Sequence, residues 1–471
     1  MPERARTGDL AIVLHSHMPY VEGFGTYPFG EEWLFDAVCR SYVPVMDVAE
    51  AVTVTVTPVL ADQLEAPGVA GRLRDFVADF RAGSVEADVG DVDEDLRPAC
   101  EAEAARYRGA HQRLSDLGDD LLALFREPAG AGRIELMASS ATHAVLPLLA
   151  TQAGRRLQVD AGLRSHARRF GEAAGLWLPE CAYEPGLETL LAERSVSYFC
   201  TDQSGHEPGL AAPAPVATPA GPTAFAIDWE AVSWLWSADG YPADPVHVDF
   251  HRKSLRGARP WAIGGGAYDP RAAAATARAQ AGRFADDVAA RLAAASSERG
   301  APGLVVFAID TELLGHWWWE GPEWLAEVQR LAPERGVQLV SLSEARRRHP
   351  AENRELHAST WGEGKDLRTW DSPAVADLAW AARRLELRLV AELGRRRVGV
   401  EATTRAAREL LALQASDWAF LDKRRQAGDY PFQRATAHAR AMLEAIHSRD
   451  DAEPRLRNLA PDLTLSPLQE P

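Results

Sequence analysis

Imidazole and carboxylate side chains follow three short apolar segments of this chain. His15 and His17 follow the first segment, Glu180 lies at the end of the second, and Asp310 follows the third. A carboxylate in apolar and aromatic surroundings needs an ionic partner or a chemical task, because burial disfavours its charged form. Glu180 and Asp310 together suit the cleavage of a glycosidic bond, in which one acid attacks or stabilises the sugar and the other transfers a proton.

The elements that position these side chains are predicted from the pattern of apolar residues. Apolar or alternating segments predict strands over 10–14, 52–57, 133–140, 196–200, 304–309 and 337–342. Helical patterns cover 155–172 and 271–295, and Ser341 with Glu344 forms a capping box for a helix after the last strand. Functional residues at the ends of parallel strands are typical of an α/β barrel. Residues two apart in a strand face the same side, so His15 and His17 should point together.

The segments that carry these residues resemble the signature regions of glycoside hydrolase family 57, and most closely its α-1,4-glucan branching enzyme subgroup. The resemblance follows the order of the chain over nearly its whole length, in the segments 15–20, 141–148, 177–183, 310–318, 359–364 and 413–420. It implies an α/β fold, a parallel (β/α)7-type distorted barrel with a helical insertion and a C-terminal helical domain. We expect the catalytic barrel over 1–348, the insertion over 61–130 and the C-terminal helical domain over 349–471, where helical patterns cover 373–392, 397–416 and 429–448.

The resemblance also implies roles for individual residues. Glu180 would be the nucleophile, and Asp310 the general acid/base, of a retaining double displacement. The residues implied in substrate binding are His15, His17, Trp33, His143, Tyr241, Arg252, Trp261, Trp318, Trp361, Trp370, Asp417, Trp418 and Gln426. A helix-core role competes for Trp33, and a plain packed loop competes with a mobile flap for Tyr241. At Gln280 the subgroup more often has a histidine.

The implied activity is that of a 1,4-α-glucan branching enzyme, which cleaves an α-1,4 linkage and transfers the chain to a 6-hydroxyl. An α-glucan hydrolase or a 4-α-glucanotransferase of the same family is the first alternative. A second alternative is a metal-dependent hydrolase, because several side chains are potential zinc ligands, namely His15, His17, His143, Asp310, Glu312 and His316. A non-catalytic glucan-binding protein is the third. The branching interpretation requires no cofactor and no metal.

The bulk composition limits the partners. A net charge of −17 argues against nucleic acid or an anionic membrane, whereas a neutral glucan polymer is compatible with it. The apolar run near the N-terminus is too short for a secretory signal, and no segment has the length of a transmembrane helix. The scattered cysteines (Cys39, Cys100, Cys181 and Cys200) favour reduced thiols in a cytoplasmic protein. The sequence carries no prediction of oligomeric state.

Overall fold

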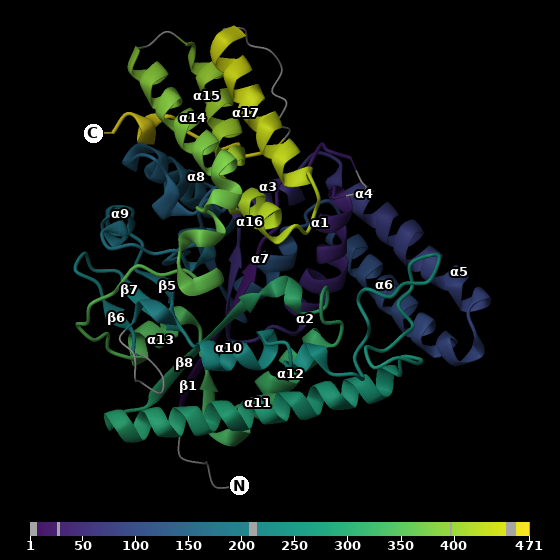
Figure 1. Ribbon diagram of the computed structural model, residues 1–471. Helices are drawn as coiled ribbons and strands as arrows, with labels where there is room; N and C mark the ends of the chain where they lie inside the picture. Colours follow the sequence, from purple (N-terminus) through teal and green to yellow (C-terminus); the bar gives the residue numbers. More distant parts are fainter. Residues whose placement is uncertain (1–6, 26–28, 207–213, 396–397, 449–457, 471) are drawn as a thin grey trace.

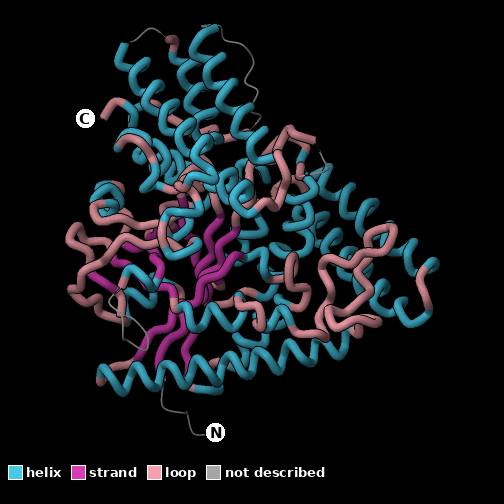
Figure 2. Tube along the Cα trace, viewed as in Figure 1, coloured by secondary structure: helices cyan, strands magenta, loops and turns pink. Residues whose placement is uncertain are grey.

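A curled, mostly parallel β-sheet forms the centre of the computed structural model, which describes the whole chain except residues 1–6, 26–28, 207–213, 396–397, 449–457 and 471. Figure 2 shows the strands surrounded by helices. The strands are β1 (Gly8–Ser16), β2 (Val52–Val56), β3 (Ile134–Ser139), β4 (Gly175–Trp177), β5 (Tyr198–Asp202), β6 (Val216–Ala217), β7 (Thr223–Ile227), β8 (Gly303–Asp310) and β9 (Val337–Leu339). Predicted strands account for β1, β2, β3, β5, β8 and β9, within a few residues at each end.

The strand order explains how the sheet curls. It is β6-β7-β5-β4-β3-β2-β1-β8, with β9 paired to the first residues of β1. All neighbouring pairs are parallel except β6 with β7. β7, the second strand of the row, approaches β8 at the opposite end, because the backbone N–H of Asp228, just after β7, donates to the carbonyl of Val306 in β8 at 2.8 Å. The sheet is therefore the distorted (β/α)7-type barrel that the sequence predicted.

Helices cover the outside of the barrel. They are α1 (Glu31–Ala37), α2 (Val43–Val48), α8 (Gln152–Phe170), α9 (Leu187–Glu193), α10 (Trp229–Trp236), α11 (Pro270–Arg299), α12 (Gly321–Leu331) and α13 (Leu342–Arg348). The Asp269 side chain caps the first turn of α11, and Gly300 ends it in the left-handed conformation. One half of the predicted capping box of α13 is present, because the Ser341 side chain accepts from the backbone N–H of Glu344. The Glu344 carboxylate pairs with Arg347 and Arg348.

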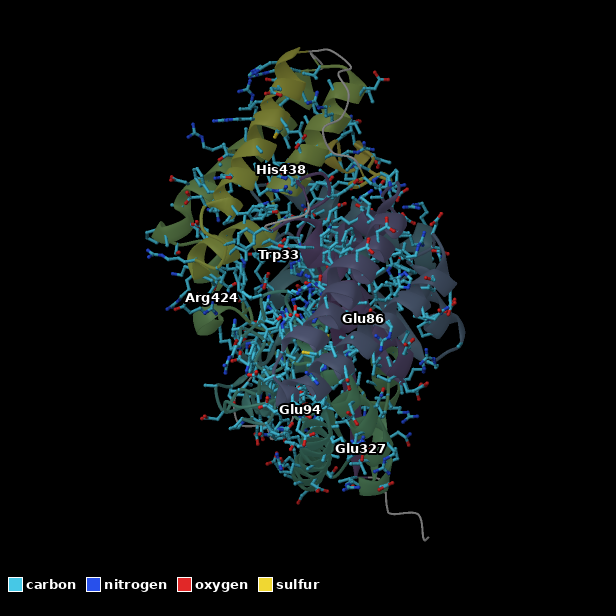
Figure 3. The ribbon with its side chains drawn as sticks, turned by 90° about the vertical axis from the view of Figure 1, so that its right-hand side faces the viewer. Trp33, Glu86, Glu94, Glu327, Arg424 and His438 are labelled. Carbon is cyan, nitrogen blue, oxygen red and sulfur yellow. The ribbon has the colours of Figure 1, made fainter. Side chains whose placement is uncertain are left out.

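A helical segment between β2 and β3 occupies the region predicted as an insertion. It contains α3 (Pro58–Leu64), α4 (Val69–Asp75), a π-helical stretch (Phe76–Gly83), α5 (Ser84–Asp91), α6 (Arg97–Leu117) and α7 (Ala123–Gly130). In Figure 1, α5 and α6 extend away from the sheet on the right. In Figure 3, Glu86 and Glu94 mark this segment.

The C-terminal helices lie over the carboxyl ends of the barrel strands. They are α14 (Ala376–Arg395), α15 (Val400–Leu413), α16 (Ser416–Arg424) and α17 (Tyr430–Ser448), at the top of Figure 1. Figure 3 places His438 among these helices and Trp33 of α1 beneath them. The hydroxyl of Thr142 donates to the carbonyl of Leu411 at 2.5 Å, which joins the barrel to α15. The boundary at residue 348 stays a proposed one.

Candidate active site

The two predicted catalytic acids lie at the carboxyl ends of β4 and β8. Asp310 is the last residue of β8 and pairs in register with His15 at the end of β1. Glu180 lies in the short turn after β4, at φ +60° and ψ +20°. This left-handed conformation is unfavourable for a residue with a Cβ, and such residues cluster at functional sites. His143 also has a positive φ, of 58°. Two residues of the site therefore hold a backbone conformation that is unfavourable for a residue with a Cβ.

Each carboxylate oxygen of Glu180 accepts one hydrogen bond. The indole N–H of Trp361 donates to Oε2 at 2.9 Å, and the hydroxyl of Ser416 donates to Oε1 at 2.7 Å. Burial raises the pKa of Glu180, and these two donors oppose that rise because they bind the ionised form. The arrangement holds one rotamer of the carboxylate and supports its charged state.

Two neutral histidines lie beside Glu180. Nε2 of His15 and Nε2 of His143 are 2.9 Å apart, and the His15 ring stacks on Trp177 with 4.7 Å between centroids. Nδ1 of His143 is 2.9 Å from the hydroxyl oxygen of Ser416. Burial lowers the pKa of both histidines well below the ordinary value. Both rings are therefore uncharged at neutral pH.

His17 differs in charge from its two neighbours. Its Nε2 is 3.0 Å from a carboxylate oxygen of Asp417, and its Nδ1 is 3.1 Å from the hydroxyl of Thr57. Burial alone would lower the pKa of His17, but the negative charges of Asp417, Glu312 and Glu180 outweigh it, so the pKa is raised. The site thus contains one histidine that favours the cationic form and two that favour the neutral form.

Among the carboxyl groups of the site, Asp310 has the most strongly raised pKa. Burial, followed by the negative charges of Glu312 and Glu180, raises the pKa of Asp310 to about 8. Glu312 accepts hydrogen bonds from the backbone N–H of His17 at 3.0 Å and from the hydroxyl of Tyr42. Burial raises the pKa of Glu312 to about 7. Near neutral pH a protonated Asp310 therefore lies close enough to a hydrogen-bonded Glu180 for the charge of Glu180 to act on it. This is the division of roles that acid-assisted nucleophilic displacement requires.

The structure brings several of the predicted binding residues into this network. His15, His17, His143, Trp361 and Asp417 all contact one another or Glu180. Trp33 lies outside this network of described residues. Its ring lies 5.1 Å from the ring of Phe29, just before α1, and 6.1 Å from the ring of Tyr430, the first residue of α17, measured between centroids.

The tryptophans predicted to bind sugar differ in exposure. Trp318, Trp370 and Trp418 are buried, at 1%, 3% and 1% exposure. In this conformation their rings pack against protein, and a role in binding stays a prediction. Trp317, Trp318 and Trp319 are adjacent in the sequence, and Trp317 is the exposed one of the three, at 53%.

The remaining predicted residues lie outside the hydrogen-bond network around Glu180. Tyr241 and Arg252 belong to the segment between α10 and α11, where the Arg252 guanidinium lies 4.3 Å over the ring of Trp261. The Tyr241 ring is 5.6 Å from the Arg283 guanidinium. Gln426 is exposed just after α16. A substrate contact for these residues stays a prediction.

The buried Gln280 has a clear structural task. Its side-chain oxygen is 3.0 Å from Nε2 of His247, and its amide nitrogen donates to the carbonyl of Tyr241 at 3.3 Å and to Asp244 at 3.2 Å. It therefore ties α11 to the segment that carries Tyr241.

Sequence reasoning missed four residues that hold the site together. Ser416, Thr57 and Tyr42 contribute hydroxyl groups, and Glu312 was considered only as a metal ligand. For Ser416 and Glu312 the available signal was their position in the sequence. Ser416 precedes Asp417, and Glu312 lies two residues after Asp310, within segments already singled out. Within the described residues, no three His, Cys, Asp or Glu side chains are arranged so that they could hold a metal ion.

Comparison with known proteins agrees with the fold and the site. Glycosyl hydrolase family 57 matches residues 110–357, and the C-terminal family of 1,4-alpha-glucan branching enzymes matches residues 378–460. The 1,4-alpha-glucan branching enzyme of Thermococcus kodakarensis is 32% identical, over 92% of this chain and 72% of that protein. The chain belongs to glycosyl hydrolase family 57.

Solved structures extend the comparison to the whole fold. The GH57-type branching enzyme from Pyrococcus horikoshii superposes with a TM-score of 0.92 at 29% identity, covering 99% of this chain and 98% of that one. An alpha-amylase from Thermotoga maritima shares the fold, with a TM-score of 0.88 at 22% identity over 99% of both chains. Because an amylase and a branching enzyme share the architecture, the fold alone does not distinguish their activities.

Proposed function

We propose that this protein is a 1,4-α-glucan branching enzyme with Glu180 as nucleophile and Asp310 as general acid/base. One observation carries the proposal. Ser416, within the segment that matches the branching enzyme C-terminal family, donates directly to the Glu180 carboxylate. A region that matches the branching enzyme C-terminal family thus donates to the proposed nucleophile, and relatives that match more than nine-tenths of this chain carry that name.

In the first step a carboxylate oxygen of Glu180 attacks the anomeric carbon of the donor chain. The bond from that carbon to the 4-oxygen of the next glucose breaks, and Asp310 gives its proton to the departing 4-oxygen. The pKa of Asp310, about 8, keeps the proton available at neutral pH. The Trp361 and Ser416 donors orient Glu180 for the attack.

In the second step the 6-hydroxyl of an acceptor chain replaces the enzyme on the anomeric carbon. The ionised Asp310 takes the hydroxyl proton, the 6-oxygen forms the new bond, and Glu180 leaves as a carboxylate. Two displacements restore the α-configuration. Hydrolysis follows the same steps with water as the acceptor, so the choice between branching and hydrolysis depends on which acceptor the cleft admits.

The products formed from amylose test this assignment. We expect new α-1,6 linkages, detected by NMR or by debranching followed by chain-length analysis, with little increase in reducing ends. Reducing sugar without α-1,6 linkages would instead identify a hydrolase, and rearranged α-1,4 chains alone would identify a 4-α-glucanotransferase.

Replacement of Glu312 by Gln should move the alkaline limb of the pH–activity profile to lower pH. The amide carries no negative charge to oppose ionisation of Asp310, so the pKa of Asp310 should fall from about 8. Asp310 acts as an acid only below its pKa, so activity should be lost at lower pH than in the wild type. The measurement is kcat/KM for a soluble maltooligosaccharide between about pH 5 and pH 9.

Glu327→Gln is the matched control for that experiment, because Glu327 lies on α12 and pairs with Arg330 at the surface; Figure 3 labels its position. Its profile should match the wild type. An alkaline limb that stays in place in Glu312→Gln would show that the Glu312 charge does not act on Asp310.

We propose an α-glucan polymer, amylose-like or glycogen-like, as the substrate, and the cytoplasm as the location. All four cysteines are free and buried, which suits a reducing compartment. In the part of the chain that the structure describes, no helix combines the length and apolar character needed to cross a bilayer.

A further inference from the structure

The hydrogen bonds around Glu180 have a defined direction. An ionised carboxylate can only accept, so the single hydroxyl hydrogen of Ser416 must point to Oε1 of Glu180, 2.7 Å away. The oxygen of Ser416 is then an acceptor for its other neighbour, Nδ1 of His143, at 2.9 Å. His143 must therefore carry its proton on Nδ1.

The direction continues through the second histidine. A neutral imidazole has one N–H, so His143 with a proton on Nδ1 has a bare Nε2. That nitrogen is 2.9 Å from Nε2 of His15, which must donate. His15 then has its own bare nitrogen at Nδ1. That atom is buried and has no hydrogen-bond partner among the described residues, which fits a nitrogen without a proton.

We propose that Ser416 is a positioning residue for the nucleophile, the last link of an ordered chain in which His15 donates to His143, His143 to Ser416, and Ser416 to Glu180. The proposal rests on the proposed role of Glu180. All the donated protons point toward the carboxylate, so the chain stabilises the charged form of Glu180 and fixes its orientation. Ser416 is only 4% exposed, which keeps water from replacing it.

The placement of Ser416 depends on docking of the C-terminal helices. Its backbone N–H donates to the carbonyl of His143 at 3.2 Å, and Ala415 forms a β-bridge with Ala144. Backbone pairing between 143–144 and 415–416 therefore places the Ser416 side chain beside the His143 ring. Trp361, the other donor to Glu180, also lies C-terminal to the proposed barrel boundary. The proposed barrel thus supplies Glu180, and the part of the chain after the barrel supplies both of the groups that donate hydrogen bonds to it.

Ser416→Ala should lower kcat by roughly 10- to 100-fold, the effect of removing a hydrogen bond to a charged group. The pKa of Glu180 should rise, because the ionised form loses a donor, and the acid limb of the pH profile should move to higher pH. KM should change less than kcat. Ser416→Thr retains the hydroxyl and should restore both the rate and the acid limb.

Thr403→Val is the matched control. It removes a hydroxyl from α15 that binds the carbonyl of Gly399 at 2.7 Å, within the same group of helices. Its pH profile should equal that of the wild type. Thermal unfolding of each variant separates a loss of folding from a loss of positioning.

The tautomers provide a test that needs no turnover. In wild-type protein labelled with 15N-histidine, long-range 1H–15N correlation should show His143 protonated at Nδ1 and His15 at Nε2. In Ser416→Ala the His143 signal should shift or show exchange between tautomers. A wild-type His143 protonated at Nε2, or Ser416→Ala with an unchanged acid limb and rate, would overturn the proposal. If the tautomers are as expected but Glu180→Gln remains active, the chain stands and the nucleophile assignment fails.

Discussion

Glu180→Gln should reduce formation of α-1,6 linkages by at least about four orders of magnitude, the scale seen when a covalent catalyst loses its nucleophile. The amide has nearly the same shape, but its single oxygen can accept only one of the two hydrogen bonds that Ser416 and Trp361 donate to separate carboxylate oxygens. It lacks the negative charge that makes the carboxylate oxygen a nucleophile toward the anomeric carbon. The measurement is linkage analysis of amylose incubated with equal amounts of the two proteins.

An activated donor makes this prediction specific. α-Maltosyl fluoride has a leaving group that needs no proton, so it bypasses the acid but still requires the nucleophile. Glu180→Gln should remain inactive with it, and intact-protein mass spectrometry should find no glycosylated enzyme. A variant that uses either donor at the wild-type rate would show that another group attacks the sugar.

Asp310→Asn should lower turnover of amylose by about 10²- to 10⁴-fold, the usual contribution of general acid–base catalysis. The amide cannot give a proton to the departing 4-oxygen, and it cannot take one from the acceptor hydroxyl. The alkaline limb that reflects the pKa of Asp310, about 8 in the wild type, should also disappear from the residual activity. The measurements are the rate of branching and its pH dependence.

α-Maltosyl fluoride should separate the two steps in Asp310→Asn. Formation of the covalent intermediate needs no acid with this donor, whereas its transfer to a 6-hydroxyl needs a base. The intermediate should therefore accumulate, with an added mass on a peptide that contains Glu180. If Asp310→Asn loses the fluoride reaction as completely as Glu180→Gln does, Asp310 is not the proton donor, and Glu312 becomes the candidate to test.

The positions of the candidate acids at strand ends could be predicted from the sequence. Apolar segments that end in His15, Glu180 and Asp310 became β1, β4 and β8, and these residues lie at the carboxyl ends of those strands. The physical reason is local. A buried parallel strand needs a continuous apolar run, and the polar residue that ends the run must leave the sheet at its edge.

The partners of those residues were decided by the tertiary structure. Ser416 is separated from Glu180 by 236 residues, and Trp361 by 181, yet each donates to one oxygen of the same carboxylate. Sequence patterns report periodicity within a window of about ten to twenty residues. They do not report which distant backbone segments come within hydrogen-bond distance.

Exposure of the tryptophans depended on the tertiary structure in the same way. Trp317 and Trp318 are neighbours in a segment without a regular period, and one is open at 53% while the other is buried at 1%. Trp318 is enclosed because the rings of His247 and Trp324, from different elements, pack on it at 5.6 Å. The sequence by itself determined most of the strands and the acids at their ends. Only the folded chain determined the donors, the tautomers and the exposed rings, because each of these depends on contacts between segments that no local pattern describes.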